Sequence, residues 1–391
     1  MLKGKSILLG ITGSVAAYKA IELIKRLRQE EASVTVIMTE ASKRFITPLS
    51  LEVAAGERVY DDMFSAPLSH VNLPAGADCF IIAPATANII SKYANGIADD
   101  MLSTTLLAFN KKVIIAPAMN WRMYENQIFQ KHLHYLSSIG VAMVGPERGN
   151  LACGEEGMGR MADVESIVEA AVSALVEKDL AGEQVLVTAG PTREYLDPVR
   201  FLSNRSSGKM GYALAKIAKR RGAEVTLVSG PTAIKPPEGV DLIRVETAQE
   251  MYTAVMDNIP MSTLFIMSAA VADFAPLETK STKIEKKEKF SLNLIKTTDI
   301  LAEVGKLKKK PFTVGFAAET GSRIDRARKK LLGKDVDMIV FNDVSKKGAG
   351  FDVDTNEVVL IDREHELPLP MMSKENIAVA IFDRILAVKN G

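Results

Sequence analysis

Two stretches of the chain each combine a short apolar run, a loop rich in Gly and Ser, and the start of a helical pattern. The longer stretch spans 185–211, where Val185–Val187 reads as a buried strand and the loop ends in Ser206–Gly211. The other runs from Ile7–Leu9 into Gly10–Ser14. Free N–H groups at a helix start, together with the helix dipole, favour an anion such as a phosphate. The sequence therefore predicts two strand–loop–helix units that bind a nucleotide phosphate, one in each half of the chain.

The chain between and after these stretches alternates short apolar runs with helical patterns. The runs are 33–38, 78–82, 112–115 and 141–144 in the first half, and 185–188, 224–228, 264–267, 312–316 and 338–341 in the second. Such alternation predicts parallel sheets with helices on both faces, and hence an α/β fold with two Rossmann-like domains. A late run at 358–361 favours an antiparallel hairpin strand. Ligands bind at the carboxyl ends of parallel strands, so we expect the chemistry in the loops that follow them.

The length of 391 residues allows two domains of ordinary size. A Gly-rich stretch at 150–161 is long enough to be a mobile loop, and a helical pattern at 164–178 closes the first half. The segment 179–183 suits a linker. We therefore expect one domain at 1–180 and a second at 185–391.

The charges of the chain are balanced, with 49 Lys and Arg against 48 Asp and Glu. This balance gives no reason to expect binding to nucleic acid or to a membrane surface. No apolar run approaches the roughly 20 residues that span a bilayer, and the N-terminus runs into a strand pattern without a signal-peptide cleavage site. Two cysteines far apart offer no disulfide framework, so we expect a reducing, cytoplasmic setting.

The first Gly loop, Gly10–Ser14, allows two interpretations. It binds a phosphate, or it only makes a tight turn before the helix expected at 16–29. The loop does not fit the G-x-G-x-x-G fingerprint, and the strand at 33–38 runs into Thr39 rather than an acidic residue. Because ordinary NAD binding needs both features, the sequence argues against it.

Three side chains of the first half are candidates for chemistry. His70 lies in a segment that reads as a loop before a strand, where it suits a general base, although a lone His is more often structural. Asn120 follows the strand at 112–115, and its amide can donate to a carboxylate, whereas the nearby Met and Tyr side chains favour core packing. Cys153 lies in the polar Gly-rich stretch, either as an accessible thiol or as a cysteine exposed by chance, while Cys79 reads as a buried small hydrophobe.

The lysines of the second half form two groups. The first group, Lys280, Lys283, Lys286, Lys287 and Lys289, follows the loop 269–273. It suits either a solvated face or a flexible basic lid over phosphates. Lys330 and Lys334 are four residues apart, hence on one face of a helix, where they bind phosphates or only add surface charge.

Taken together, these motifs resemble one enzyme family, the bifunctional phosphopantothenoylcysteine decarboxylase/phosphopantothenate–cysteine ligases of coenzyme A biosynthesis. The first half is similar to flavin-dependent cysteine decarboxylases through GITGSVAAYK, the His70 segment, APATAN, GIADD, PAMNWRMY and the Cys153 loop. The second half is similar to the ligase through TAGPTREYLDPVRFLSNRSSGKMG, SAAVADF, the Lys283 segment, GFAAET and FNDVS. The resemblance covers essentially the whole chain. Two positions depart from it: Tyr124 stands where relatives often carry Trp, and the usual K-I-K-K reads KIEKK from Lys283.

The resemblance implies a flavodoxin-like first domain that binds FMN, with Gly13 and Ser14 near the phosphate. The further flavin contacts that it implies are Thr39, Pro84, Thr86, Asn88 and Met119. Members of the family oxidise the cysteine thiol with FMN so that carbon dioxide can leave, and then return the electrons to give 4′-phosphopantetheine. By this resemblance His70 is the base, Asn120 holds the carboxylate and Cys153 protonates the enethiol.

The resemblance implies a nucleotide-binding ligase in the second domain, which uses CTP and Mg²⁺ or Mn²⁺. The carboxylate of 4′-phosphopantothenate attacks the α-phosphate to form an acyl-cytidylate, and the amine of cysteine then displaces CMP. Asn204 would orient the acyl intermediate, and Lys283 would contact the triphosphate. The further CTP contacts implied are Ser268, Ala269, Ala270, Asp273, Thr298, Asp299, Ile300, Leu301, Phe316, Lys330 and Lys334. The metal ligands stay unassigned.

The resemblance also implies the partners of the chain. These are small-molecule substrates and further copies of the chain itself, with no nucleic acid and no membrane. Family members form trimers through the flavin domain and dimers through the ligase domain, which together build a dodecamer.

Two other classes of protein compete with this interpretation. A nicotinamide-dependent oxidoreductase would explain two Rossmann-like halves, but the glycine fingerprint is wrong. A non-catalytic regulatory subunit on the flavoprotein fold would be expected to lose His70 or Asn120, and both are present. A yellow purified protein with the absorbance of oxidised flavin would distinguish a flavoprotein from a nicotinamide-dependent oxidoreductase.

Overall fold

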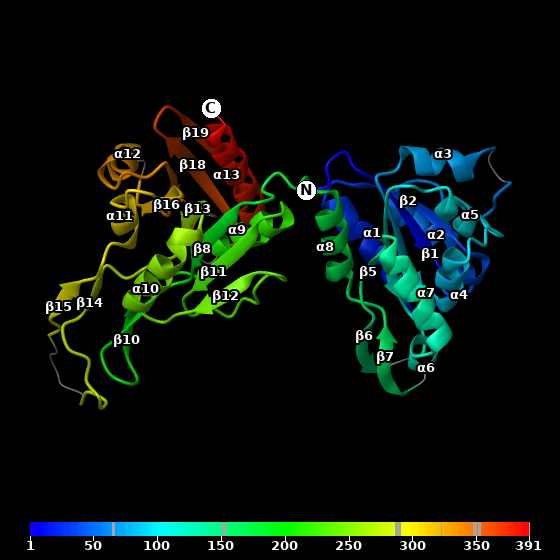
Figure 1. Cartoon of the computed structure of the whole chain (residues 1–391), viewed down its shortest axis with the longest axis horizontal. Helices are drawn as coiled ribbons and strands as arrows, with labels where there is room; N and C mark the ends of the chain where they lie inside the picture. The colour runs from blue at the N-terminus through cyan, green and yellow to red at the C-terminus, as the bar shows by residue number, and fades with distance from the viewer. Residues whose placement is uncertain are drawn as a thin grey trace. The chain divides into compact units, whose positions relative to one another are not determined.

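A computed structural model describes residues 1–64, 67–150, 154–285, 291–321, 323–346, 350 and 353–390 of the chain (Figure 1). The chain divides into two compact units, Met1–Val176 and Glu177–Gly391. The division falls before the expected linker because that segment packs on the second unit. There Leu180 is buried, and the guanidinium of Arg221 donates to Asp179 over 2.8 Å.

The first unit is built on a parallel sheet that, within the described residues, has five strands in the order β2-β1-β3-β4-β5. The strands are β1 (Ser6–Ile11), β2 (Ser33–Met38), β3 (Cys79–Ala85), β4 (Lys112–Pro117) and β5 (Ala142–Met143). This is the strand order of flavodoxin-like proteins, in which ligands bind where the order reverses, between β1 and β3. The sheet thus confirms the fold expected for the first half.

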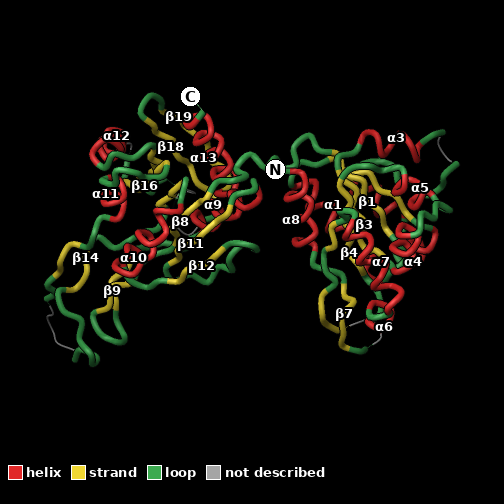
Figure 2. The backbone as a smooth tube through the Cα atoms, viewed as in Figure 1, coloured by secondary structure: helices red, strands yellow, loops and turns green. Residues whose placement is uncertain are grey.

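Helices cover both faces of this sheet because successive side chains of each strand point to opposite sides. On β3, Cys79 and Ile81 join the core under one set of helices, and Phe80 and Ile82 join the core under the other. The elements of the first face are η1 (Val15–Lys19), α1 (Ala20–Gln29), α2 (Pro48–Ala55) and α8 (Val164–Leu175). The short 3₁₀ turn η2 (Glu40–Arg44) follows β2. The second core receives α4 (Ala87–Ala94), α5 (Met101–Leu107) and α7 (Gln127–Ser138). Figure 2 shows both layers of helices flanking the strands.

One local expectation for the first half is confirmed with a difference, and two are wrong. The helix expected at 16–29 is present and ends at Gln29, but its first part is the 3₁₀ turn η1, and it becomes α-helical only at Ala20. The described residues of the stretch 150–161, which was expected to be a loop, belong mostly to an antiparallel hairpin of β6 (Glu147–Asn150) and β7 (Glu156–Arg160), whose glycines hide any strand pattern; 151–153 lie outside the described residues. His70 lies in the first turn of the short helix α3 (Ser69–Gly76) rather than in a loop.

The second unit contains an eight-stranded sheet within its described residues, in the order β12-β11-β8-β13-β16-β17-β18-β19. The parallel strands are β8 (Gln184–Ala189), β11 (Glu224–Ser229), β12 (Asp241–Arg244), β13 (Leu264–Met267), β16 (Phe312–Glu319) and β17 (Met338–Asp343). Numbered by sequence, these six follow the Rossmann order 3-2-1-4-5-6, with the reversal between β8 and β13. The antiparallel pair β18 (Thr355–Asp362) and β19 (Glu366–Ser373) confirms the expected late hairpin.

Helices and two small strand pairs complete the second unit. The helices are α9 (Lys209–Arg220), α10 (Ala248–Asn258), η3 (Ile259–Met261), α11 (Ile300–Gly305), α12 (Ile324–Gly333) and α13 (Lys374–Lys389). The pairs are β9 (Arg193–Tyr195) with β10 (Phe201–Ser203), and β14 (Phe274–Pro276) with β15 (Leu294–Lys296). Sequence periodicity missed both pairs because strands of three residues are too short to show a period of two.

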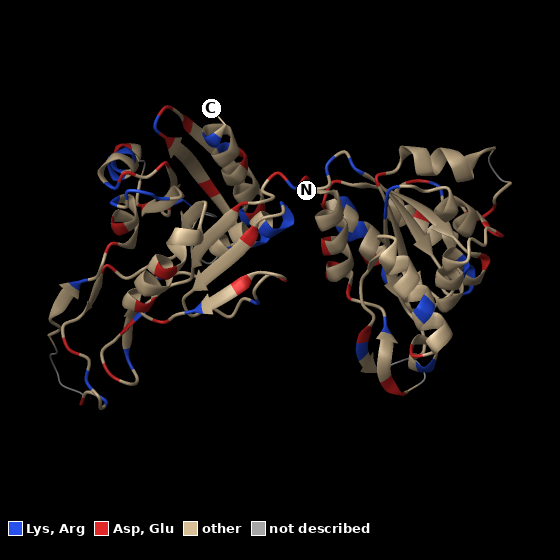
Figure 3. Ribbon diagram, viewed as in Figure 1, with Lys and Arg blue, Asp and Glu red and all other residues tan. Residues whose placement is uncertain are grey.

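Lys and Arg are interspersed with Asp and Glu over both units, as Figure 3 shows. This agrees with the balanced totals of the sequence. Among the described residues, no helix has the length and apolar character needed to cross a membrane.

Candidate active sites

The loops after β1 and β3 of the first unit are joined by the hydroxyl of Thr12. This side chain is buried, donates to the carbonyl oxygen of Pro84 over 2.7 Å and accepts from the N–H of Thr86 over 3.0 Å. The predicted residues Ser14 and Thr86 are thereby held at the point where the strand order reverses. Sequence reasoning missed Thr12, although it lies inside the Gly loop that was singled out.

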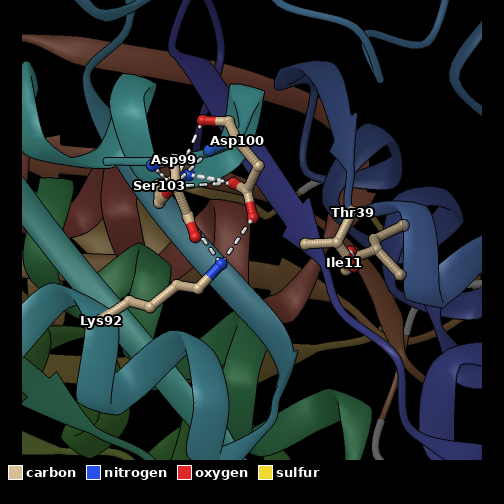
Figure 4. A network of polar contacts seen from close by, with 6 residues as sticks. All are labelled: Ile11, Thr39, Lys92, Asp99, Asp100 and Ser103. Atoms are coloured by element: carbon tan, nitrogen blue, oxygen red, sulfur yellow. Dashed lines mark hydrogen bonds and ion pairs between the residues drawn. The ribbon is translucent and has the colours of Figure 1, made fainter. Parts of the chain in front are cut away.

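The Gly loop packs closely against the turn that follows β2. A Cβ added at Gly13 would lie 2.7 Å from the Cβ of Ala41, so only glycine fits without a shift. The hydroxyl of Ser14 accepts from the N–H of Ala16 over 3.3 Å and so caps η1. Thr39 lies beside this loop, and its N–H donates to the carbonyl oxygen of Ile11 over 3.1 Å (Figure 4).

A cavity of about 440 Å³ opens next to this loop. Its lining includes three of the predicted residues, Ser14, Met119 and Asn120, together with Tyr18 and Arg160. Six further residues predicted for the first unit are described by the structure but do not line this cavity. They are Gly13, Thr39, His70, Pro84, Thr86 and Asn88.

Asn120 is held in a defined orientation between β4 and the short helix α6 (Trp121–Tyr124). Its Oδ1 accepts from the N–H of Arg122 over 2.9 Å, which leaves the amide nitrogen as its donor. The indole N–H of Trp121 and the guanidinium of Arg122 each donate to Glu155 over 2.7 Å. The bond from Trp121, with the charge of Arg122 and a bond from Asn120, keeps the pKa of Glu155 below its ordinary value. Glu155, which sequence reasoning missed, therefore ties the β6–β7 segment to Asn120.

The hairpin strand β7 approaches the backbone before Asn120. The N–H of Met119 donates to the carbonyl oxygen of Gly159 over 3.0 Å. A Cβ at Gly159 would lie 2.1 Å from the carbonyl oxygen of Met119, and the φ of +149° also favours glycine. Cys153, the expected acid, lies outside the residues that the structure describes.

His70 carries a polar atom that finds no protein partner in the described part of the chain. Its Nδ1 is buried without a hydrogen bond, although the residue as a whole is half-buried. Buried polar atoms are nearly always paired, so an orphaned imidazole nitrogen is compatible with a bound group that the protein itself does not supply.

The motif at 96–100 has a structural role in the first unit. The carboxylate of Asp100 accepts from the N–H of Ser103 over 2.7 Å and starts α5 with a capping box. Lys92 at the end of α4 donates to Asp99 over 2.6 Å and to Asp100 over 3.2 Å (Figure 4). This network fixes the connection between α4 and α5.

A cavity of about 400 Å³ lies in the second unit, at the carboxyl ends of β8, β13, β16 and β17. It brings together all of the residues predicted for the ligase except Lys283. These are Asn204, Ser268, Ala269, Ala270, Asp273, Thr298, Asp299, Ile300, Leu301, Phe316, Lys330 and Lys334. The residues come from five separate segments of the chain, so their convergence is a result of the fold.

Two lysines, Lys330 and Lys334, place positive charge in the lining of this cavity. Lys334 forms an ion pair with Asp299 at 2.7 Å, and Asp299 in turn caps α11 by accepting from the N–H of Ala302. Lys330 donates to the carbonyl oxygen of Phe316 over 2.7 Å. Burial, and then the charge of Lys334, lowers the pKa of Lys330. A ligand with phosphate groups would stabilise the charged form of both lysines.

Asn204 and the start of α9 form another part of the same cavity. The amide nitrogen of Asn204 donates to the carbonyl oxygen of Val271 over 2.9 Å, which joins the two loops at the reversal point. Gly208 precedes α9 with a φ of +79° and places no side-chain cap on the helix. The first N–H groups of α9 therefore lie at the wall of the cavity, where they suit an anion.

Lys283 is exposed and does not line the cavity. Its neighbour Ile284 donates its N–H to the buried carboxylate of Asp197 over 3.0 Å, at the turn between β9 and β10. Lys280 pairs with Glu278 over 2.7 Å. Lys286, Lys287 and Lys289 lie outside the described residues, so the proposed basic lid stays a prediction.

Known proteins resemble the chain over nearly its whole length. Residues 1–176 match the family described as Flavoprotein, and residues 180–388 match the family described as DNA/pantothenate metabolism flavoprotein C-terminal domain. The coenzyme A biosynthesis bifunctional protein CoaBC of Bacillus subtilis is 44% identical over 398 residues, covering 99% of this chain and 98% of the relative. The protein of the same name from Vibrio cholerae is 45% identical over 392 residues and covers 98% of both chains.

Solved structures resemble one half of the chain each. The C-terminal domain of a CoaBC protein is 40% identical, covers 54% of this chain and 98% of its own, and gives a TM-score of 0.47. The FMN-dependent cysteine decarboxylase SpaF is 29% identical, covers 44% of this chain and 99% of its own, and gives a TM-score of 0.39. On the full-length relatives, the chain belongs to the family of coenzyme A biosynthesis bifunctional proteins and is an enzyme with ligase and decarboxylase activities.

Proposed function

We propose that the second unit joins 4′-phosphopantothenate to cysteine with CTP, and that the first unit decarboxylates the product with FMN to give 4′-phosphopantetheine. The observation that carries this proposal is the cavity of the second unit. Its lining gathers nearly every residue that the family resemblance assigns to CTP and to the acyl intermediate.

Lys330 and Lys334 supply the charge that the first step needs. The substrate carboxylate attacks the α-phosphate of CTP, an acyl–phosphate bond forms, and pyrophosphate leaves. Preorganised cations stabilise the charge that develops on the leaving phosphates, often the largest single contribution to catalysis. Because Lys334 already pairs with Asp299, its ammonium group is held in place before the nucleotide binds.

A divalent cation, Mg²⁺ or Mn²⁺, accompanies the triphosphate in this proposal. Among the described residues no three His, Cys, Asp or Glu side chains cluster in a way that could hold a metal ion. Mg²⁺ bound to a nucleotide is held mainly by substrate phosphates and water, so we assign the cation to the phosphate oxygens of CTP and leave any protein ligand unassigned.

The loops of the first unit fit the phosphate and ring of FMN. The tight packing at Gly13 holds the loop at the end of β1, and Ser14 lines the cavity beside it. The flavin supplies the oxidation and the return of electrons. The protein contributes Asn120, whose amide group donates and suits the departing carboxylate, and His70, whose Nδ1 has no partner among the described residues and suits proton transfer. Cys153 remains the proposed acid for the enethiol.

We also propose that the enzyme works in the cytoplasm as a homo-oligomer. Trimers would form through the first unit and dimers through the second, which together give a dodecamer. Light scattering of the purified enzyme measures the number of copies, and a monomer would contradict this assembly.

A quenched reaction without cysteine tests the ligase roles. Wild-type enzyme supplied with CTP, Mg²⁺ and 4′-phosphopantothenate should accumulate the acyl-cytidylate, detected by mass spectrometry. Asn204→Asp should form this adduct but turn it over poorly when cysteine is added, since loss of one such donor costs about 10²–10³ in rate. Lys283→Gln should fail to form the adduct. Abundant adduct with Lys283→Gln, or none with Asn204→Asp, would reverse the two roles.

A further inference from the structure

Asn342 is a residue of the second cavity that the proposed chemistry has not used. It lies near the end of β17, beside Ala318 of β16, and it lines the cavity. The residue is only 8% exposed, yet its Oδ1 has no hydrogen-bond partner within the described part of the chain. A buried acceptor without a partner is energetically costly, so an unpartnered polar atom in a binding cavity points to a ligand with a donor.

The surroundings of Asn342 narrow the chemical class of that ligand. Lys374, which starts α13 and is 6% exposed, lines the same cavity, as do Lys209 and the uncapped first turn of α9. This part of the cavity thus offers positive charge and N–H donors together with one acceptor. A molecule with a carboxylate and an amine matches both properties.

We propose that Asn342 forms the subsite for the amino-acid substrate and that its Oδ1 accepts a hydrogen bond from the amine of cysteine. The inference rests on the proposed ligase function, in which cysteine is the substrate that carries both a primary amine and a free carboxylate. The carboxylate of cysteine would lie toward Lys374 and the start of α9. Asn342 is then a positioning residue for the attacking nitrogen and has no part in the first step.

The proposed step balances in atoms and charge. The ammonium group of cysteine first releases one proton to solvent, because only the neutral amine has a lone pair for attack. The amine nitrogen then forms a bond to the acyl carbon, the bond from that carbon to the phosphate oxygen breaks, and CMP leaves. The nitrogen loses a second proton as the amide forms. A neutral amide oxygen at Asn342 orients the amine without favouring the ammonium form.

Three variants test this subsite. Asn342→Leu should form the acyl-cytidylate at the wild-type rate without cysteine, and should raise the KM for cysteine about tenfold, the effect of one hydrogen bond of about 1.4 kcal/mol. Asn342→Asp keeps an acceptor but stabilises the ammonium, so the pH profile of cysteine turnover should move to higher pH. The matched control is Asn258→Leu outside this lining, because the amide nitrogen of Asn258 donates to the carbonyl oxygen of Ala254 over 2.8 Å. It should leave the KM for cysteine unchanged.

The outcomes separate the subsite from its alternatives. An unchanged KM for cysteine in Asn342→Leu, or an unchanged pH profile in Asn342→Asp, would overturn the proposal. Slower adduct formation in Asn342→Leu would also overturn it, by assigning Asn342 to 4′-phosphopantothenate or CTP. If Asn342→Leu does not fold, the pH profile of Asn342→Asp decides alone. Absence of adduct from the wild-type enzyme would instead refute the proposed ligase mechanism.

Discussion

Gly159→Ala is expected to disable the first unit through a contact made by a single added carbon atom. The new Cβ would lie 2.1 Å from the carbonyl oxygen of Met119, whereas real Cβ atoms almost never approach another heavy atom within 3.0 Å. That oxygen belongs to the backbone, so it cannot rotate away as a side chain would. The hairpin and the Met119–Asn120 backbone must therefore separate by roughly 1 Å, and the φ of +149° adds strain for alanine.

The expected size of the effect follows from that displacement. A shift of about 1 Å in a residue that positions substrate can cost about 10² in rate, and overpacking of this kind costs about 1–3 kcal/mol in stability. Since Asn120 follows Met119 directly, we expect decarboxylation to fall about 100-fold. Ligation should be unchanged, because its residues all lie in the second unit.

The assay supplies phosphopantothenoylcysteine and follows the release of carbon dioxide, with ligation measured on the same preparation. Gly149→Ala on the neighbouring strand is the matched control. Its Cβ would meet only the flexible side chain of Arg160, at 3.3 Å, so its decarboxylation should stay near the wild-type rate. Full decarboxylation by Gly159→Ala would refute the claim that β7 positions Asn120. Equal losses in both variants would show a general effect on the hairpin instead.

Three further predictions concern the two activities and the stability of the chain. His70→Asn and Asn120→Asp should each abolish carbon dioxide release and leave CMP formation intact, and normal phosphopantetheine output from either variant would remove that residue from the mechanism. Chelation of divalent cations with EDTA should stop acyl-cytidylate formation but spare decarboxylation of added phosphopantothenoylcysteine; loss of both would contradict the assignment of the metal to CTP. Burial raises the pKa of Asp362, but the N–H groups of His365 and Glu364 and the guanidinium of Arg384 lower it more, so its folded pKa lies below the ordinary value of about 3.9. The carboxylate therefore stabilises the fold at pH values above about 3.9, and it loses that effect as the pH falls through the lower folded pKa. Urea unfolding of Asp362→Asn should therefore show a deficit at pH 7 that disappears in acid, and a deficit independent of pH would refute this linkage.

Buried strands and strand-end loops were predictable from the sequence. Predicted bounds of 33–38 and 264–267 agree with β2 and β13, because continuous apolar runs between turn residues have few other stable structures. The ligase residues were predicted through motif resemblance, and the parallel sheet explains why they meet, since their loops all leave the same edge.

The features that were not predictable depend on partners distant in sequence. Thr12 bonds Pro84 across 72 residues, and Glu155 bonds Trp121 across 34. Neither contact leaves a periodic pattern. The strands of β9–β10 and β6–β7 are short or rich in Gly, so pairing rather than intrinsic preference decides them. The Oδ1 of Asn342 is recognised as unpartnered only from the three-dimensional positions of the donors among the described residues.

The most direct test of the whole account follows the carboxyl carbon of cysteine. The enzyme would be supplied with 4′-phosphopantothenate, CTP, Mg²⁺ and cysteine labelled with ¹³C in its carboxyl group, and the products analysed by mass spectrometry. If the second unit ligates and the first then decarboxylates, each CMP formed should be matched by one labelled carbon dioxide and one unlabelled 4′-phosphopantetheine. CMP formation with the label retained in the pantothenoyl product, or labelled carbon dioxide without CMP, would contradict the proposed sequence of the two reactions.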